Sequence, residues 1–594
     1  MPADRTKPTA PGQPVVTEID VYGNATVTVT ESTDNIAVAG YIAFVDGSVV
    51  EAARSDSNVI ELSKLTTGTH SVAVAAFDAA GNISDLSVDS GSFYVDLSEG
   101  VSFENKSAGL DGRKGYITIG DSWIGASNFG GSLSSITSIG TTATATASSV
   151  HGLLPGMYVL IENVDQAGYA GFHKVLTIPT TTEFTFTTVD ADIANATSPS
   201  VVVYVIQQKV GDRNFAYLAN CMSNQRLKYL ANWGVGGDKI ADTASLIDSA
   251  LNPANNLHND IVKIVFCMVG INDIANDRTY EQITVDYLNL FDKLKNVERV
   301  IFMLPATLSA SHGSWTALRG QTLSRVHIWL HENAGANDNF IVIDSDRIFT
   351  DAANVNGDFK SGYSLDGIHP SKLGALQLAK AINTNVLSKM PDVFRSWPTS
   401  QLSVYSANNL SPQLNDNPTM QGVGGNAWGT GASGVSPDGY TASSLGGGSQ
   451  TVAFSVNPKT DGTGNYLRCV INAVDSLDRI DIQRSANLSS RVSAGDRVIF
   501  AVSIDASSVS GLLRYYQVGL QVTAAGVTST IDAIASQGTD VFGEPNFFLR
   551  FETPVFIVPD GLTSMQIKCQ VVYNGVGAGT FDFSDADIIN LSKI

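Results

Sequence analysis

Cysteine and basic residues are scarce in this chain. Its 594 residues include four cysteines, and 36 Lys and Arg face 57 Asp and Glu, for a net charge of −21 and a pI near 4.7. The cysteines are too few and too widely spaced for a disulfide-rich scaffold, and no metal-ligand spacing appears, so we expect no metal. The missing basic clusters argue against a nucleic-acid partner and an anionic membrane surface.

Long apolar runs are also absent. No run reaches the length of a transmembrane helix, and the segment from Met1 to Lys7 lacks the apolar core of a signal peptide. We therefore expect no membrane partner. The chain is then cytosolic, exported by another route, or part of a particle that leaves the cell by lysis. Cys221 and Cys267 lie in apolar contexts typical of buried thiols, whereas pairing of Cys469 with Cys569 stays open.

A candidate nucleophile follows one of the shorter apolar runs. The segment Tyr116-Ile117-Thr118-Ile119 ends in Gly120-Asp121-Ser122, and Asp366-Gly367-Ile368-His369 follows far downstream. A serine needs a histidine to take its proton and a carboxylate to hold that histidine. Of the eight histidines, only His369 has an acid three residues before it. We predict the catalytic residues Ser122, Asp366 and His369.

Two further segments offer donors for a developing oxyanion. Gly237 lies in the glycine-rich run 234–237, and Asn272 follows the apolar run 264–269 within Gly270-Ile271-Asn272-Asp273. A side-chain amide there would lie at the carboxyl edge of a sheet, where α/β proteins place their sites. Each segment alone is also typical of an ordinary turn or helix cap.

The four blocks in this order resemble the SGNH (GDSL-type) hydrolases. The resemblance implies a three-layer α/β/α sandwich with a parallel sheet, Ser122 as nucleophile, and Asp366 and His369 as its partners. It also implies an oxyanion hole made by Ser122, Gly237 and Asn272, with no cofactor. Trp123 stands where the family has leucine. An α/β-hydrolase would need Gly-x-Ser-x-Gly, which the chain lacks.

The remaining chain reads as β-structure around this hydrolase, and the length suggests about four domains. We predict a flexible start at 1–11, a β-sandwich at 12–97, and a hydrolase at 113–131 and 209–392. The stretches 65–70 and 76–84 resemble a fibronectin type III module, with another immunoglobulin-like sandwich as the alternative. Alternating segments within 132–208 predict a β-domain inserted after the nucleophile, over the active-site face, because so long a structureless loop is improbable. Residues 401–594 predict a β-sandwich.

Two of these β regions carry weaker resemblances. The insert resembles small β modules of bacteriophage tail proteins, and the C-terminal region resembles carbohydrate-binding jelly rolls, with a trimerising or stabilising sandwich as the alternative. Together they suggest a phage tailspike or tail-fibre esterase, located in the virion tail or outside the cell, that removes O-acetyl groups from capsule or O-antigen. Expected partners are that acetylated polysaccharide, other tail proteins and further copies, as a trimer if it is a tailspike.

Two other functions stay open, together with the role of two tryptophans. One is a secreted bacterial carbohydrate esterase or lipase, and the other is a receptor-binding tail protein whose hydrolase fold is inactive. Trp123 and Trp233 flank catalytic blocks and are candidates for a substrate wall, although large aromatics are more often core.

Overall fold

The computed structural model describes residues 4–19, 24–62, 65, 68–95, 113–125, 128–196, 203–305, 312–354, 357–390, 412–484, 487–543 and 546–593. The chain divides into a small unit, Met1–Ser107, and a large unit, Ala108–Ile594. Within the described residues no helix is long and apolar enough to cross a membrane. The linker-like stretch 395–400 lies outside the described residues.

The small unit is built from short antiparallel strands. They form three sheets, ordered β1-β2-β5, β4-β3-β7 and β6-β8. Alternation puts Val27, Ile60 and Val74 in one buried core, as expected of a sandwich with one face of each strand inside. The strands are β1 (Val15–Ile19), β2 (Ala25–Thr28), β3 (Val38–Val45), β4 (Ala53–Ser55), β5 (Val59–Leu62), β6 (Gly68–His70), β7 (Val72–Asp78) and β8 (Phe93–Val95).

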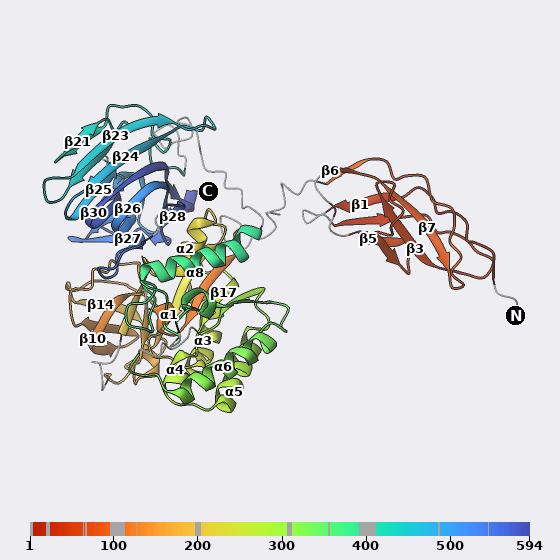
Figure 1. Ribbon diagram of the computed structural model, residues 1–594, viewed down its shortest axis with the longest axis horizontal. Coiled ribbons are helices and arrows are strands. Elements are labelled where there is room, and N and C mark those ends of the chain that lie inside the picture. The colour runs from red at the N-terminus through yellow and green to blue at the C-terminus, as the bar shows by residue number, and fades with distance from the viewer. Residues whose placement is uncertain are drawn as a thin grey trace. The chain divides into compact units, whose positions relative to one another are not determined.

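A parallel sheet of five strands forms the centre of the hydrolase region in the large unit (Figure 1). Its strand order is β16-β9-β17-β18-β19, and every pairing is parallel. Both faces of the sheet are covered, which is why its strands read as nearly continuous apolar runs. The strands are β9 (Gly115–Gly120), β16 (Lys228–Gly234), β17 (Val262–Met268), β18 (Arg299–Met303) and β19 (Phe340–Ile343).

Helices cover the two faces of this sheet as separate layers. Phe266 packs with α2 and α8 on one face, whereas Val265, the next residue, packs with α3, α5 and α6 on the other. The predicted three-layer α/β/α arrangement is therefore present. The helices are α1 (Ser122–Gly125), α2 (Phe215–Met222), α3 (Ile240–Leu251), α4 (Ile271–Ala275), α5 (Tyr280–Leu294), α6 (Ala317–Asn333), α7 (Ser345–Phe349) and α8 (Lys372–Asn385).

The inserted domain is a small β-structure organised around one long strand. The first part of β10 pairs with β15, and its second part pairs with β11, so β10 serves two sheets. These strands begin at Asn128 and end at Gly211, slightly outside the predicted limits of 132 and 208. They are β10 (Asn128–Ile139), β11 (Thr142–Ala147), β12 (Tyr158–Glu162), β13 (Gly171–Lys174), β14 (Glu183–Thr187) and β15 (Val203–Gly211).

Two long strands, β26 and β30, run through the whole C-terminal region. The first part of β26 pairs with the last part of β30 and with β28 and β29. The last part of β26 pairs with the first part of β30 and with β27. Each of the two strands therefore contributes to both layers of a sandwich. The strands are β20 (Asn426–Gly429), β21 (Ala432–Gly434), β22 (Tyr440–Leu445), β23 (Thr451–Pro458), β24 (Asn465–Ala473), β25 (Ser476–Arg484), β26 (Arg497–Ala524), β27 (Val527–Ala535), β28 (Phe548–Glu552), β29 (Phe556–Ile557) and β30 (Leu562–Asn590).

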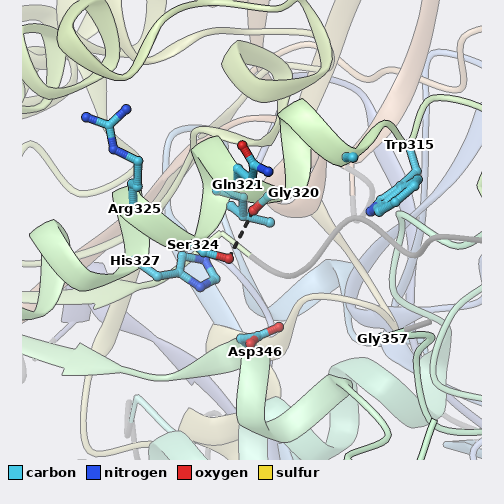
Figure 2. A pocket seen from close by; sticks show the side chains of 10 residues that line it. Trp315, Gly320, Gln321, Ser324, Arg325, His327, Asp346 and Gly357 are labelled. Atoms are coloured by element: carbon cyan, nitrogen blue, oxygen red, sulfur yellow. Dashed lines mark hydrogen bonds between the residues drawn. The ribbon is translucent and has the colours of Figure 1, made fainter. Parts of the chain in front are cut away.

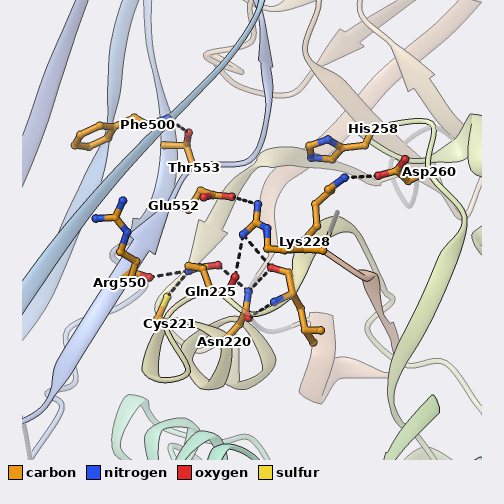
Figure 3. Close-up of polar contacts among 12 residues, drawn as sticks. Asn220, Cys221, Gln225, Lys228, His258, Asp260, Phe500, Arg550, Glu552 and Thr553 are labelled. Atoms are coloured by element: carbon orange, nitrogen blue, oxygen red, sulfur yellow. Dashed lines mark hydrogen bonds and ion pairs between the residues drawn. The ribbon is translucent and has the colours of Figure 1, made fainter. Parts of the chain in front are cut away.

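This C-terminal sandwich (described residues 412–593) shares buried contacts with the hydrolase and the insert instead of standing apart. β15 of the insert pairs in parallel with β27 of the sandwich. Arg113 forms a 2.7 Å ion pair with Glu552, and those side chains are 1% and 9% exposed. Gln225 Nε2 donates to the Arg550 carbonyl at 2.8 Å (Figure 3). The predicted domain boundaries therefore separate sequence segments that fold together as one compact unit.

All four cysteines are free and buried, including Cys469 and Cys569. Cys469 lies opposite Phe581, whereas Cys569 lies opposite Ile482 and Val518. Cys469 and Cys569 therefore do not form a disulfide bridge with each other. Burial raises the pKa of each of the two thiols.

Candidate active site

The end of β9 presents Ser122 at the carboxyl edge of the parallel sheet. Gly120 has a φ of +148°, and a Cβ built there would lie 1.9 Å from the Met268 carbonyl oxygen. Only glycine fits so close to the neighbouring strand. Asp121 N then donates to that same carbonyl at 3.1 Å, which fixes the turn where α1 begins with Ser122.

Ser122, His369 and Asp366 form one hydrogen-bonded chain. Ser122 Oγ lies 2.9 Å from His369 Nε2, and His369 Nδ1 lies 2.7 Å from Asp366 Oδ2. Asp366 Oδ1 accepts from the backbone N–H groups of His369 at 2.7 Å and Ile368 at 3.0 Å. The serine thus has a base, and the base has a carboxylate that orients its ring, which is the arrangement needed for nucleophilic catalysis.

The Asp366 carboxyl is held in its charged form. Burial acts to raise its pKa, but hydrogen bonds from the His369 side chain and from the backbone outweigh burial, so this pKa lies below its usual value. The side chains of His369 and Asp366 are 34% and 50% exposed. The three residues therefore lie at an open surface that a large substrate can reach.

The predicted oxyanion donors Gly237 and Asn272 lie in the segments that follow β16 and β17. Asn272 Nδ2 donates to the Asp238 carbonyl at 2.8 Å, which ties the block after β17 to the loop after β16. Gly237 has a φ of +89°, and its N–H, like that of Ser122, makes no hydrogen bond within the described part of the chain. Two unpaired backbone donors and one oriented amide are suited to a developing oxyanion.

Two buried carboxyls hold these loops in place. Burial raises the pKa of Asp121 to about 7, although the N–H groups of Trp123 and Gly270 donate to it. Burial also raises the pKa of Asp273 to about 6; its Oδ2 accepts from Ile240 N at 3.0 Å. Gly270 has a φ of +128°, and a Cβ built there would lie 2.1 Å from Tyr287 Oη, so glycine is required at this position. These acids are not among the residues that sequence reasoning selected.

Trp123 and Trp233 do not form the predicted substrate wall. Both side chains are 1% exposed. Trp123 packs edge-on against Phe349, with ring centroids 4.8 Å apart, and Trp233 stacks on Phe172 of the insert at 6.1 Å. The reason is apolar burial: one ring completes the core beneath the nucleophile turn, and the other joins the insert to the sheet.

A cleft of about 620 Å³ opens beside the triad, and the insert supplies much of its lining. Ser122, Asp366 and His369 line it from the hydrolase side, whereas Gly237 and Asn272 do not line it. The sequence had placed the insert over this face, but it carried no signal for which insert residues reach the cleft. Those residues are Asn128, Phe129, Gly130, Gly131, Ser132, Glu162, Asn163, Val203, Tyr204 and Val205.

A second pocket of about 600 Å³ lies along α6, away from these residues. Figure 2 shows Trp315, His327 and Asp346 around it. His327 Nε2 lies 2.6 Å from the Pro305 carbonyl oxygen, and Asp346 Oδ1 accepts from Thr350 Oγ1 at 2.7 Å. The pocket therefore contains no serine or cysteine paired with a base, and it offers no comparable chemistry.

The triad is not part of any group suited to hold a metal ion. Within the described residues, the one close cluster of potential ligands is Asp4, Asp34 and Asp78 in the small unit. Asp78 already accepts from the backbone N–H groups of Ala80 and Asn82. The expectation of a reaction without metal or cofactor stays a prediction.

Comparison with known proteins gives one family match. Residues 204–376 match the GDSL-like lipase/acylhydrolase family. This stretch contains Gly237, Asn272, Asp366 and His369 but begins after Ser122, because the insert separates the nucleophile from the other blocks. No curated protein matches the chain.

Several solved structures show low overall similarity. A GDSL-like lipase from Bacteroides thetaiotaomicron is 15% identical, with a TM-score of 0.23, over 27% of this chain and 76% of that chain. A lipolytic G-D-S-L family member from Veillonella parvula is 16% identical, with a TM-score of 0.22, over 30% and 89%. A family 22 carbohydrate binding module from Clostridium thermocellum is 17% identical, with a TM-score of 0.19, over 26% and 88%. Such low scores transfer no ligand to this chain.

The family match and the hydrogen-bonded residues at the sheet edge agree on the same region. Four of the five parallel strands, most of the covering helices and the blocks of Gly237, Asn272, Asp366 and His369 lie within the matched residues, whereas β9 and Ser122 precede them. The chain carries a GDSL/SGNH lipase/acylhydrolase domain, an esterase or acylhydrolase, within a larger multidomain protein.

Proposed function

We propose that this protein is a serine esterase that removes O-acetyl groups from a bacterial surface polysaccharide, either capsule or O-antigen. The observation that carries the proposal is the Ser122–His369–Asp366 chain at an open cleft whose other wall belongs to the insert. A wall contributed by an added domain is suited to a substrate much larger than the ester bond itself. Remote contacts with such a substrate can raise kcat/KM.

The reaction proceeds in two steps on Ser122. Its Oγ attacks the ester carbonyl carbon while its proton passes to His369 Nε2, and Asp366 holds the imidazolium that forms. The N–H groups of Ser122 and Gly237 and the Asn272 amide stabilise the oxyanion. The sugar hydroxyl leaves with the proton from His369. Water, deprotonated by His369, then cleaves the acetyl-serine and releases acetate.

We also propose that the enzyme works in a bacteriophage tail, as a tailspike or tail fibre that meets its host outside the cell. The likeness of the insert to phage tail modules and the acidic composition of the chain support this setting. Other tail proteins, and two further copies of the chain in a trimeric spike, are the proposed partners. The C-terminal sandwich is a candidate for sugar binding.

Removing the nucleophile tests the proposal. We expect Ser122→Ala to lower hydrolysis of p-nitrophenyl acetate and acetate release from acetylated capsule or O-antigen by about 10⁴-fold or more, because the covalent route is lost. The control is Ser132→Ala, which removes an exposed hydroxyl from the same cleft and should keep activity on the aryl ester.

The outcomes separate the candidate functions. A Ser122→Ala variant that stays within about tenfold of wild type would reject the assigned nucleophile. A wild type with no esterase activity would indicate an inactive receptor-binding protein. Strong activity on long-chain acyl esters without any release of acetate from polysaccharide would indicate a lipase.

A further inference from the structure

The cleft beside the triad contains an acid that the reaction does not use. Glu162 is the last residue of β12 in the insert, paired in register with Val203, and it lines the cleft together with Ser122 and His369. Its carboxylate makes no hydrogen bond or ion pair with any described residue. The next residue, Asn163, has a φ of +61° and also lines the cleft. Glu162 and Asn163 thus both line the cleft from the insert.

The surroundings of Glu162 give it no structural partner. Burial raises its pKa to about 7, and the nearby Asp238 carboxyl is a like charge. Of the residues that line the cleft, Arg213 is the sole arginine or lysine, and it pairs with Asp540 at 2.5 Å. The other ionisable side chains there are Asp366 and His369. A partly buried acid without a counter-ion is a cost to the fold, and such groups concentrate at functional sites.

The position of the acid relates it to the alcohol side of the ester. An acetyl group is small, whereas a cleft of about 620 Å³ is in the range that holds a drug-sized ligand. The part of the substrate that extends toward the insert is therefore the leaving alcohol.

We propose that this cleft binds a neutral, hydroxyl-rich sugar as the alcohol part of the ester, and that Glu162 accepts hydrogen bonds from the hydroxyl groups of that sugar. The inference rests on the proposed esterase function and narrows its substrate class. Hydroxyl donors satisfy a desolvated carboxylate, whereas an aliphatic chain would leave it unpaired. A uronate ring would place a second negative charge beside Glu162 and Asp366.

The test compares Glu162→Gln with wild type at pH 8, where the carboxyl is ionised. The substrates are p-nitrophenyl acetate, acetylated xylo-oligosaccharides as the neutral sugar and acetylated homogalacturonan as the anionic one. Glu183→Gln is the matched control, because Glu183 lies on β14 of the same insert and does not line the cleft.

For Glu162→Gln we expect kcat/KM on the neutral sugar to fall by about 10- to 100-fold, the range for a hydrogen bond to a charged group. Activity on p-nitrophenyl acetate should stay within about twofold, since its nitrophenyl leaving group carries no further hydroxyl that could donate to Glu162. The preference for the neutral over the anionic sugar should shrink, because the repulsive charge is gone. Glu183→Gln should behave like wild type on all three substrates.

Other outcomes would overturn the inference. Equal activity of wild type and Glu162→Gln on both sugars, or parallel losses on the sugar and the aryl ester, would remove Glu162 from sugar recognition. Those results leave the esterase assignment intact. A wild type that cleaves p-nitrophenyl acetate through Ser122 but neither sugar would overturn this inference together with the carbohydrate part of the proposed function.

Discussion

Individual residues at the sheet edge have roles that their chemistry requires. Gly120 and Gly270 stand where a Cβ would collide with the neighbouring strand or with Tyr287. Asp121, buried between the blocks, accepts the backbone N–H groups of Trp123 in the nucleophile turn and of Gly270 after β17. The short motifs that mark the family thus contain both reacting groups and residues that set the backbone geometry. The glycines and Asp121 position the reacting groups without touching a substrate.

Asn272→Ala should separate oxyanion stabilisation from substrate binding. We expect kcat to fall by about 10²- to 10³-fold with little change in KM, because the amide contributes chiefly in the transition state. The measurement is steady-state kinetics on p-nitrophenyl acetate. Asn276→Ala is the control: that exposed amide donates to the Asn272 carbonyl and lies outside the site. A loss confined to KM would show that Asn272 binds substrate uniformly.

At the scale of elements, the insert and the C-terminal sandwich are both built into the hydrolase. The helix that follows His369, α8, begins at Lys372 with Ser371 as its N-cap and ends at Asn385. The start of this helix is also where the sandwich docks. Lys372 Nζ lies 2.9 Å from Asp212 Oδ2 and donates to the Arg514 carbonyl at 2.8 Å. Both ionic side chains are fully buried.

Lys372→Met should destabilise the large unit strongly. The variant leaves the buried Asp212 carboxyl without its counter-ion, and breaking one partner of a buried pair costs about 3–5 kcal/mol. Urea unfolding of the variant, compared with Lys389→Met at an exposed position after the same helix, measures this loss. Adding Asp212→Asn to Lys372→Met should recover part of the stability. A single variant as stable as wild type would show that the pair does not hold the two regions together.

At the scale of the whole molecule, folding shifts the pKa values of the acidic side chains in both directions. Burial raises the pKa of several carboxyls in the large unit, to about 7 for Asp121, Asp212, Glu162 and Asp238 and to about 6 for Asp273, Asp532 and Asp587. Asp366 and Asp416 are shifted the opposite way. The chain therefore contains carboxyls whose pKa is raised by folding and carboxyls whose pKa is lowered by it.

These shifts predict a thermal stability that falls as the pH rises from 5 to 8. A carboxyl whose pKa is raised by folding keeps its proton where the unfolded chain has lost it. Between about pH 4 and pH 7 the folded state thus binds more protons, and the free energy of unfolding decreases with pH. Acids with a lowered pKa lose their stabilising effect only below about pH 4.

Calorimetry across this range checks the prediction for the transition of the large unit. The control is the double variant Glu162→Gln with Asp238→Asn, which should flatten the decline because two of the raised acids no longer titrate. A Tm that increases from pH 5 to pH 8 would contradict the expected sign.

The sequence by itself determined the hydrolase core and the grouping of its blocks. The apolar runs of β9 and β17 end at Ser122 and Asn272, and because parallel strands share one carboxyl edge, these residues must meet there. The spacing of Asp366 and His369 likewise allowed one turn to present both. Local pattern was sufficient because each of these features is encoded within a few residues of the strand end or turn that uses it.

Only the tertiary structure decided what surrounds that edge. Trp123 and Trp233 were candidates for a substrate wall, with a core position the commoner outcome for large aromatics, and contacts with Phe349 and Phe172, distant in sequence, placed both inside. Glu162 is one ordinary acid at a strand end until the insert folds back toward Ser122. The joining of β15 to β27 depends on segments more than 300 residues apart. Such features arise from which surfaces pack together, and no local pattern in the chain records that choice.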